Sequence, residues 1–362
     1  MALTIGIDAR AAAEVPAGRG RFVRELLSAF ARLEISSAEL RFVLYAREPW
    51  GDLDPARFRW SLSAQPDPLW HVAVAHRAAR DTDCLLSTNS YLTPILSRAR
   101  TATMVYDLVP FMVADVARSQ SLWIEKATIR PAIRRSRALI CISEATQADL
   151  IRCFPQARSK AAVAPLAADA SFAPHVGAHA PAGGSTRPFV LAVGSFEPRK
   201  NLRRLVSAWE SLPADIHSTH ELVLVGPKGW GDAGVEDVGS LSSVRIAGRV
   251  SDEELRTLYA TCSCFVYPSL YEGFGLPILE AMASGAPVVT SNVSSMPEIA
   301  GDAAVLVDPL DEAAITSAIL AVLTDPALAE SLRNRGAARA SAFSWDRTAQ
   351  TILDVLRQVA AT

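Results

Sequence analysis

The chain has 362 residues, of which 50% are hydrophobic and 20% are charged. A chain of this length is long for one hydrophobic core, so two domains are expected. The net charge of −2 argues against a nucleic-acid partner. The sequence has no uninterrupted run of about 18 apolar residues, so a membrane-spanning helix is not expected.

The five cysteines argue against a zinc site and against a disulfide-bonded secreted protein. They are odd in number and lack the spacing of zinc ligands, so we expect reduced thiols in a cytoplasmic protein. These residues are Cys84, Cys141, Cys153, Cys262 and Cys264. The first residues, MALTIGIDAR, predict a strand, because a signal peptide needs a basic start and a longer apolar run.

Short apolar runs alternate with stretches of helical periodicity in the first half of the chain. Such alternation is typical of a parallel sheet covered by helices. A loop after the first run contains Gly18 and Gly20; it lacks the dinucleotide-binding pattern and predicts a loop that faces an anion or substrate. Strands are predicted at 4–7, 40–45, 84–87, 102–106 and 138–143, and helices at 22–33 and 145–154.

Residues 173–188 break this alternation and predict a linker, because they are rich in Pro, Gly, Ala and polar residues without periodicity. We therefore predict an α/β protein with two doubly wound, Rossmann-like domains, over 1–172 and 189–342, and a helix over 343–362 that packs back on the first domain. The carboxyl ends of their strands are expected to face a cleft, where open parallel sheets bind ligands. In the second half, strands are predicted at 189–193, 222–225, 244–246, 264–267, 288–290 and 305–307, and helices at 202–211, 252–260, 277–284, 311–323 and 345–359.

The segment YEGFGLPILEAMASGAP, at 271–287, is the most informative in the chain. Glu272 lies in a glycine-flanked turn, and Glu280 lies in a helix that begins near Pro277, since proline suits the first helical position. The amino end of such a helix favours a phosphate or another anion. The alternative is a core helix with two incidental acids, and the neighbouring motifs decide between the two.

A second motif, GSFEPRKN at 194–201, follows a predicted strand and precedes a helix. Arg199 and Lys200 oppose the helix macrodipole there, so a solvated basic turn explains them poorly. Two cations at this place can stabilise the charge that develops on a departing diphosphate. The loop with Arg249 and Val250 suits either a nucleobase edge or a plain strand-to-helix connection.

These motifs together resemble those of the retaining glycosyltransferases of family 4, which have the two-domain GT-B fold. The resemblance is carried by VGSFEPRKNL, LVGPKGW, GRVSDEELRTLYA and VYPSLYEGFGLPILEAMASGAPVV in the second half, and more loosely by GIDAR, VYDLVP and CISEAT in the first. It implies a mannosyltransferase-like enzyme that moves a hexose from a nucleotide sugar with retained configuration. The first domain would be the acceptor side and the second would bind the nucleotide sugar.

The resemblance also implies roles for individual residues. Glu272 would hold the hydroxyls of the donor sugar near the reacting carbon, and Glu280 would bind the ribose. Arg199 and Lys200 would contact the diphosphate. The other predicted donor-binding residues are Gly18, Gly20, Gly194, Ser195, Arg249, Val250, Gly273, Phe274, Gly275 and Leu276.

Two positions, Tyr106 and Ser195, depart from the family pattern. Such enzymes often have His-Asp where this chain has Tyr106 and Asp107, and both residues are kept as catalytic candidates. Tyr106 can replace the hydrogen bond of the histidine to the donor sugar, but it carries a proton less easily near neutral pH. Ser195 stands where some relatives have an arginine, which leaves Arg199 as the arginine contact.

The expected substrates are a GDP- or UDP-linked sugar as donor and a glycan or lipid-linked glycan as acceptor, without a cofactor. No metal-ligand pattern is present, so the two cations and a helix amino end are expected to replace a divalent ion. By resemblance the enzyme serves bacterial surface polysaccharide or lipopolysaccharide synthesis, in the cytoplasm and associated with the inner face of the plasma membrane.

Two other functions stay open. One is a non-catalytic nucleotide-sugar-binding subunit of a glycan-assembly complex, which the departure at Tyr106 motivates. The other is a sugar-nucleotide epimerase or a phosphorylase on the same fold. The basic segment RPAIRRSR, at 130–137, indicates either contact with anionic lipid or a solvated helix face.

Overall fold

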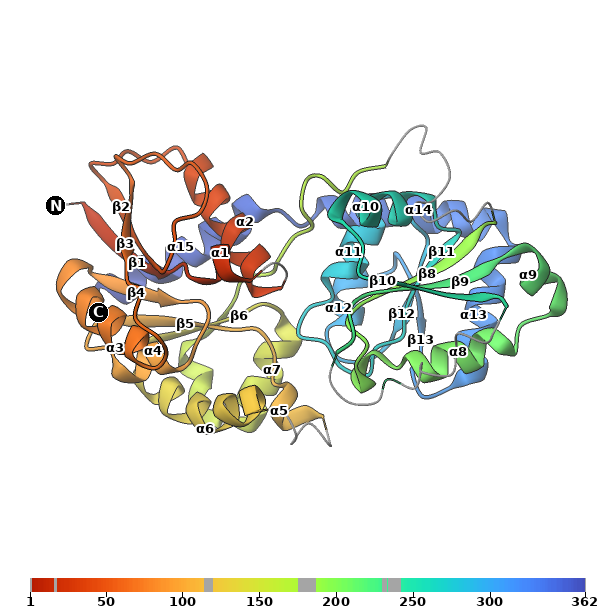
Figure 1. The fold of residues 1–362 in the computed structure, drawn as a ribbon, viewed down its shortest axis with the longest axis horizontal. Helices are drawn as coiled ribbons and strands as arrows, with labels where there is room; N and C mark the ends of the chain where they lie inside the picture. The colour runs from red at the N-terminus through yellow and green to blue at the C-terminus, as the bar shows by residue number, and fades with distance from the viewer. Residues whose placement is uncertain are drawn as a thin grey trace. The chain divides into compact units, whose positions relative to one another are not determined.

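The computed structural model describes residues 2–15, 18–113, 120–174, 187–229, 233 and 242–361. The chain forms two compact units (Figure 1): unit 1 contains Met1–Leu166 and Ser344–Thr362, and unit 2 contains Ala167–Phe343. The first segment of unit 1 thus ends at Leu166, whereas the sequence predicts a first domain that reaches residue 172. Phe172 packs on Tyr259 of unit 2, with ring centroids 5.8 Å apart. Most of the predicted linker, 175–186, lies outside the described residues.

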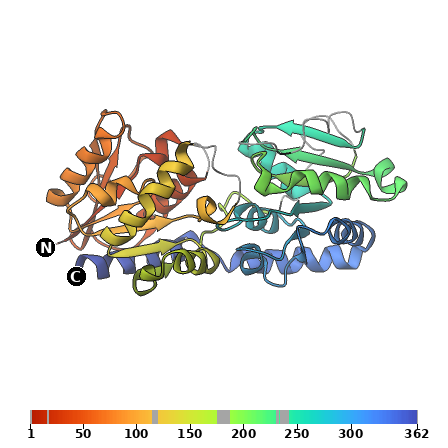
Figure 2. The ribbon, with the colours of Figure 1, turned by 90° about the horizontal axis from the view of Figure 1, so that it is seen from below.

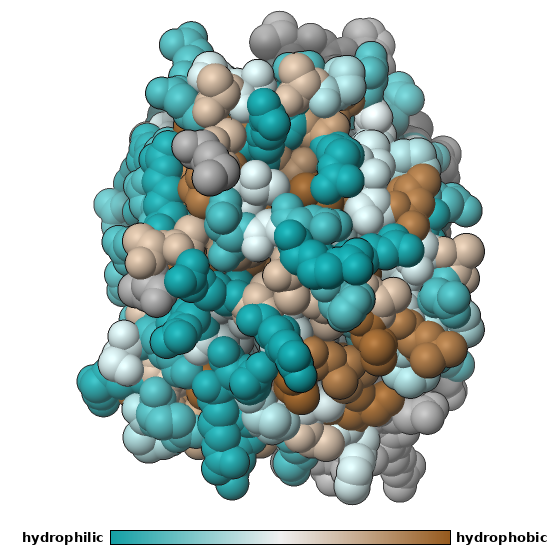
Figure 3. Space-filling view, turned by 90° about the vertical axis from the view of Figure 1, so that its left-hand side faces the viewer, coloured by the Kyte–Doolittle hydropathy of each residue, from teal (hydrophilic) through white to brown (hydrophobic). Residues whose placement is uncertain are grey.

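Unit 1 is built on a seven-stranded sheet in the order β3-β2-β1-β4-β5-β6-β7, in which all pairs are parallel. Because β1 pairs with both β2 and β4, the strand order reverses between β1 and β4. Figure 3 faces the side of unit 1 where β1 begins, and hydrophilic residues cover much of it. The strands are β1 (Leu3–Asp8), β2 (Leu40–Ala46), β3 (Phe58–Leu62), β4 (Cys84–Ser87), β5 (Thr101–Val105), β6 (Ala138–Cys141) and β7 (Ala161–Val163).

Helices cover both faces of this sheet, as Figures 1 and 2 show. One of them comes from the far end of the chain: α15 (Trp345–Ala361) packs on α2 and on β1, β4, β5 and β6. The Trp345 ring lies 5.9 Å from the ring of Phe22, and the Cys84 Sγ donates to the Leu356 carbonyl at 3.5 Å. The other helices are α1 (Ala11–Glu14), α2 (Arg19–Arg32), α3 (Leu69–Asp81), α4 (Leu92–Leu96), α5 (Val109–Met112), α6 (Gln120–Arg135), α7 (Glu144–Cys153) and the 3-10 helix η2 (Pro155–Lys160).

Unit 2 repeats this architecture on a six-stranded parallel sheet in the order β10-β9-β8-β11-β12-β13, which reverses between β8 and β11. Its strands are β8 (Phe189–Val193), β9 (Glu221–Val225), β10 (Val244–Gly248), β11 (Cys264–Tyr267), β12 (Val288–Ser291) and β13 (Val305–Val307). Its helices are η3 (Pro198–Lys200), α8 (Leu202–Glu210), α9 (Ala214–Thr219), α10 (Asp252–Thr261), α11 (Leu276–Ala283), α12 (Met296–Ala300), α13 (Glu312–Thr324) and α14 (Pro326–Ser341).

Local sequence signals explain where several of these helices begin. Ser251 closes a capping box with Glu254 at the start of α10, and the Asp311 carboxylate accepts the Ala314 N–H at 3.0 Å at the start of α13. Asp325 caps α14, whose first residue is Pro326.

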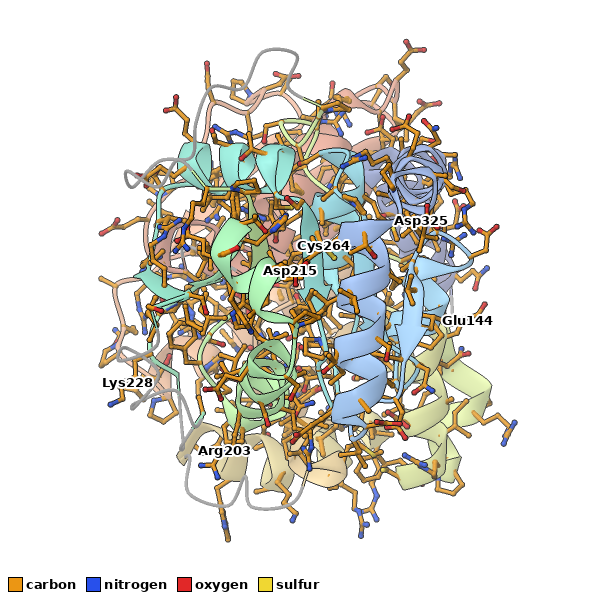
Figure 4. The ribbon with its side chains drawn as sticks, turned by 90° about the vertical axis from the view of Figure 1, so that its right-hand side faces the viewer. Glu144, Arg203, Asp215, Lys228, Cys264 and Asp325 are labelled. Carbon is orange, nitrogen blue, oxygen red and sulfur yellow. The ribbon has the colours of Figure 1, made fainter. Side chains whose placement is uncertain are left out.

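The core of unit 2 lies between the sheet and helices such as α8 and α13. Figure 4 looks onto α8, α9 and α13, with Cys264 of β11 behind these helices and Arg203 at the outer rim. All five cysteines are free thiols. Burial raises the pKa of Cys84, Cys141 and Cys262 to about 12, so these side chains are neutral near pH 7.

Across the described residues, no single helix has both the length and the apolar composition needed to span a bilayer. One pair of helical segments, Glu312–Thr324 with Pro326–Ala361, meets these criteria only when taken together, and it bends by 97° at the break.

Candidate active site

The site in unit 2 lies where the strand order of its sheet reverses. β8 and β11 are neighbours in the sheet although they are far apart in sequence, so the loops that follow them meet at its carboxyl edge. Close packing of the backbone there depends on glycine. A Cβ on Gly226 would lie 1.9 Å from the Gly194 carbonyl oxygen, and one on Gly194 would lie 3.2 Å from the Lys200 Cε.

Four charged residues converge at this edge. The Glu272 carboxylate accepts two hydrogen bonds of 2.6 Å, one from Lys200 Nζ to Oε1 and one from Arg199 Nη1 to Oε2. The Tyr267 hydroxyl donates to Glu272 Oε1 at 2.8 Å, and the Arg199 Nε donates to Glu197 Oε2 at 2.8 Å. Lys200 and Glu272 are buried, with 8% and 7% of their surfaces exposed.

The electrostatics of this ion cluster follow from burial and pairing. Burial alone would raise the pKa of Glu272, but Lys200 and Arg199 outweigh it and lower that pKa to about 2. Burial lowers the pKa of Lys200, although Glu272 opposes the shift. Arg199 and Lys200 contribute two positive charges, and Glu197 and Glu272 contribute two negative charges. The two cations are therefore balanced by carboxylates, a pairing that the sequence analysis did not predict.

The turn that carries Glu272 is held by two serines from the start of α12. The hydroxyls of Ser294 and Ser295 donate to the Glu272 carbonyl at 2.6 and 3.0 Å, and Ser295 also donates to the Phe274 carbonyl at 2.7 Å. Gly275 has a φ of 108°, which favours glycine, and α11 begins directly after it with Leu276. Gly273 is buried in the same turn.

Sequence reasoning missed Ser294 and Ser295, and also Glu197 and Tyr267. A signal for the serines is present, because they precede Met-Pro-Glu at 296–298, which is typical of a helix start.

The remaining donor-binding candidates of unit 2 lie near this turn or near other strand ends. Glu280 is buried in α11, where its Oε2 accepts the Tyr259 hydroxyl at 3.2 Å. The Ser195 hydroxyl donates to Glu197 Oε1 at 2.6 Å, so it orients the carboxylate beside Arg199. Arg249 is exposed and Val250 is half-buried after β10. Their contacts with a donor stay predictions.

The two glycines of the first loop occupy different environments in unit 1. Gly18 has a φ of 54°, and a Cβ there would meet nothing within 4 Å. Gly20 lies inside α2, where a Cβ would be only 1.7 Å from the Val15 carbonyl oxygen. Packing within unit 1 therefore explains why position 20 has no side chain. The contact of Gly18 and Gly20 with a sugar donor stays a prediction.

Tyr106 and Asp107 follow β5, at the carboxyl edge of the unit 1 sheet. The Tyr106 hydroxyl donates to the Thr88 carbonyl at 2.7 Å, and the Thr88 hydroxyl donates to the Asp8 carbonyl. Burial raises the pKa of Tyr106 well above its ordinary value, so this side chain is a neutral hydrogen-bond donor. Asp107 Oδ1 accepts the N–H of Val109, the first residue of α5, at 3.1 Å.

A cavity of about 130 Å³ adjoins Tyr106 within unit 1. Arg19 and Glu125 line it and form an ion pair, with Nη2 and Oε2 3.5 Å apart. The Arg19 guanidinium lies 5.2 Å from the centroid of the Tyr106 ring. These polar groups suit a ligand rich in hydroxyls. The full lining is Arg19, Thr88, Asn89, Ser90, Tyr91, Met104, Tyr106, Ile124, Glu125 and Thr128.

The part of the chain that the structure describes contains no group of three or more His, Cys, Asp or Glu side chains placed to hold a metal ion. The cationic side chains in contact with Glu272 at the candidate donor site are Arg199 and Lys200.

Comparison with solved structures gives the architectural class. Sucrose-phosphate synthase from Thermosynechococcus elongatus superimposes with a TM-score of 0.77 at 24% identity, covering 99% of both chains. HepE from Anabaena, solved in complex with UDP and glucose, has a TM-score of 0.74 at 16% identity, covering 99% of this chain and 100% of that one. Two doubly wound units of this kind define the GT-B fold of glycosyltransferases.

Sequence comparison then gives the family. The model for "Glycosyl transferases group 1" matches residues 180–339. The O-antigen chain mannosyltransferase B of Escherichia coli is 33% identical over 310 residues, which cover 83% of this chain and 77% of the relative. The chain belongs to the group 1 glycosyltransferases, as the resemblance of its motifs predicts.

Proposed function

We propose that this glycosyltransferase is a retaining, metal-independent mannosyltransferase. Its donor is a nucleotide sugar, GDP- or UDP-linked, and its acceptor is a glycan or lipid-linked glycan of a bacterial surface polysaccharide. The observation that carries the proposal is the similarity to an O-antigen chain mannosyltransferase over 83% of the chain. The ion cluster at Glu272 supplies the groups that such a reaction needs.

The proposed chemistry assigns one task to each member of the cluster. Arg199 and Lys200 stabilise the negative charge that develops on the diphosphate as its bond to the sugar breaks. Glu272 is ionised and has about four acceptor sites, of which Lys200, Tyr267 and Arg199 use three. The remaining site, on Oε2, is proposed to accept a hydroxyl of the donor sugar.

Retention of configuration is proposed without a covalent intermediate. The acceptor hydroxyl attacks the anomeric carbon from the face that the diphosphate leaves, and the bond from that carbon to the diphosphate oxygen breaks. The proton of the acceptor hydroxyl passes to an oxygen of the departing diphosphate. No side chain is assigned as nucleophile, because Glu272 is already committed to two cations.

The alternative of a non-catalytic sugar-nucleotide-binding subunit is less well supported. A subunit that only binds has no need to hold two cations beside a carboxylate of lowered pKa in a buried site. An epimerase or phosphorylase is also less well supported, since the similarity over most of the chain is to a sugar transferase.

A donor panel tests the proposal. Purified protein is incubated with GDP-mannose and with UDP-linked hexoses, with and without a mannose-containing acceptor, and free nucleotide is measured. We expect release with GDP-mannose that increases when acceptor is present, that survives a chelator, and that yields an α-linked product by NMR. Absence of release with every donor would favour the binding subunit, and a β-linked product would refute retention.

A matched pair of variants tests the assignment of Glu272. Glu272→Gln keeps the shape but not the charge, and we expect at least a 100-fold loss of nucleotide release. Glu330→Gln changes an exposed acid on α14 and is expected to leave release unchanged. Equal activity of both variants would contradict the site.

The proposed location is the cytoplasm, at the inner face of the plasma membrane. Five free cysteines, four of them buried, support a reducing compartment. Fractionation of cells that express the tagged protein, at low and at high salt, tests both parts of this proposal.

A further inference from the structure

A second concave site in unit 1 is strongly basic. It has a volume of about 500 Å³ and contains six cationic side chains and no carboxylate in its lining. We call it the basic pocket, and its residues are Arg98, Ala99, Arg100, Arg134, Arg135, Ser136, Arg137, Ser159 and Lys160.

The topology of the sheet explains how these cations come together. Residues 98–100 precede β5, residues 134–137 precede β6, and residues 159–160 precede β7. Because β5, β6 and β7 are parallel neighbours, the residues before them meet at the amino edge of the sheet. Tyr106 and Asp107 follow β5 and lie at the opposite edge. The basic pocket is therefore separate from the candidate substrate site of unit 1.

Three of the six cations are held in place by backbone carbonyls, which position them without neutralising them. Arg135 Nη2 donates to the Ser97 carbonyl at 2.8 Å, Arg100 Nη1 donates to the Ala360 carbonyl at 2.9 Å, and Lys160 Nζ donates to the Ser136 carbonyl at 2.9 Å. The pocket is thus pre-formed on its walls by contacts that tie α6, α15 and the segment before β7 together.

The other three cations lack such contacts. The side chains of Arg98, Arg134 and Arg137 are exposed and form no hydrogen bond or ion pair with any residue in the described ranges. Partial burial lowers the pKa of Lys160, and the nearby positive charge of Arg137 lowers it further.

A simpler explanation is that the cations cap the carboxyl end of α6. Lys160 and Arg135 do lie near that end, and cations there are favourable. A helix end carries only about half an elementary charge, however, and Arg98, Arg100 and Arg137 lie outside the helix. Most of the positive charge in the pocket is therefore not explained by capping.

We propose that the basic pocket binds a ligand with at least two negative charges carried by phosphate groups. Arginine recognises phosphate oxygens in pairs, and the three arginines without partners are available for this purpose. Two sources share this chemistry: a soluble pyrophosphate or phosphomonoester, and the phosphate of a lipid headgroup at a bilayer surface. The proposal goes beyond the proposed function, because sugar transfer does not require a ligand at this edge.

The test compares two triple variants that remove the same charge. Arg98, Arg134 and Arg137 are changed to Gln in the pocket variant, and the exposed Arg32, Arg59 and Arg80 are changed to Gln in the control variant. Both lose three positive charges from unit 1. Because the pocket arginines repel one another, we expect the pocket variant to melt at a temperature no lower than that of the control. The double variant Arg134→Gln, Arg137→Gln repeats the test with a smaller change.

Two probes distinguish the sources. Inorganic pyrophosphate is titrated calorimetrically at low salt, and flotation is measured with phosphatidylcholine vesicles with and without about one-third phosphatidylglycerol. We expect at least a tenfold weaker binding of one or both probes by the pocket variant, with the control matching the wild type. If the pocket variant loses pyrophosphate binding, the ligand of the basic pocket is a soluble phosphate compound. If it loses only flotation with the vesicles, the ligand is a lipid headgroup.

The proposal is overturned if the pocket and control variants behave alike with both probes. Nucleotide release from the donor panel is measured in the same variants, and we expect it to equal that of the wild type in solution. A failure of the transferase proposal would therefore be seen in the wild-type protein, independently of the pocket.

Discussion

Each unit carries a buried carboxyl group at the carboxyl edge of its sheet, beside the point where the strand order reverses, and the environment of this group differs between the units. In unit 1, Asp8 ends β1, and its Oδ1 accepts only the Arg10 N–H at 3.4 Å, while Oδ2 is buried with no partner among the described residues. In unit 2, Glu272 follows β11 and holds two cations at 2.6 Å. Burial raises the pKa of Asp8 to about 6, whereas the pKa of Glu272 is lowered to about 2.

The comparison shows that the fold supplies the position and the neighbouring residues decide the charge. Both carboxyl groups lose contact with water, which alone favours the neutral acid. Only unit 2 provides two cations close enough to reverse this effect. Unit 1 instead ties its strand ends together through neutral hydrogen bonds, from Tyr106 to Thr88 and from Thr88 to Asp8.

The largest expected effect comes from removing the carboxylate of unit 2. Glu272→Ala leaves Lys200 and Arg199 buried without their main partner, so we expect the free energy of unfolding to fall by about 3–5 kcal/mol. The sequence motif alone predicts that Glu272→Ala loses activity but folds normally. The loss of stability is expected only because the structure shows Glu272 paired with two buried cations. Urea denaturation of the purified protein, followed by fluorescence, measures the difference.

Asp346→Ala is the matched control for this prediction. Its carboxylate also contacts an arginine, Arg32, at 2.6 Å, but both side chains are more than half exposed. An exposed pair contributes about 0–1 kcal/mol, so the control should lose little stability. Equal losses in the two variants would show that burial does not strengthen the cluster in unit 2.

The second prediction concerns the pH dependence of stability and has opposite signs in the two units. The folded state raises the pKa of Asp8 from 3.8 to about 6, so Asp8 lowers the free energy of unfolding by about 3 kcal/mol as pH rises through this range. In Asp8→Asn this decline should be absent. Glu272 contributes stability above about pH 4.5, and this contribution is lost as pH falls toward about 2.

Urea denaturation at pH 4.5 and pH 7.5 measures this effect in the wild type, in Asp8→Asn and in the exposed control Asp52→Asn. The control should follow the wild type. A wild-type pH profile identical to that of Asp8→Asn would mean that the buried carboxyl group of unit 1 has an ordinary pKa.

The smallest expected effect belongs to the neutral network of unit 1. Tyr106→Phe removes the hydrogen bond to the Thr88 carbonyl, so we expect a loss of about 1 kcal/mol in the free energy of unfolding. Since this hydroxyl is neutral and committed to the backbone, we expect nucleotide release to fall by less than about tenfold. A loss of more than 100-fold would show that Tyr106 contacts the reacting sugar directly.

The sequence predicted most elements of unit 2 and fewer of unit 1. The strands at 189–193, 264–267 and 305–307 have the predicted bounds, because they are short apolar runs that end at turn residues. No bounds were predicted for β3 and β7 at the edges of the first sheet, nor for the helices α1, α3, α4, α5, α6, α9, α12 and α14. β3 has five residues, of which only Phe58 is buried, and β7 has only three residues, all half-buried. The Ala- and Arg-rich α14 shows little apolar periodicity.

The candidate site was predicted residue by residue but not as an arrangement. Glu272, Arg199 and Lys200 belong to recognisable motifs, so the sequence identifies each of them. Their contact depends on the adjacency of β8 and β11, which no local pattern encodes. The charge balance with Glu197 and the support from Ser294 and Ser295 are likewise consequences of tertiary structure.

The course of α15 has a consequence for biosynthesis. Unit 2 is a continuous stretch of chain inserted into unit 1, whose last helix covers β1, β4, β5 and β6. A ribosome therefore releases every residue of unit 2 before it releases the helix that completes the amino-terminal half. During translation the apolar face around Phe22 and Cys84 stays uncovered until α15 has been synthesised. Unit 1 is therefore expected to complete its folding after unit 2, although its synthesis begins first.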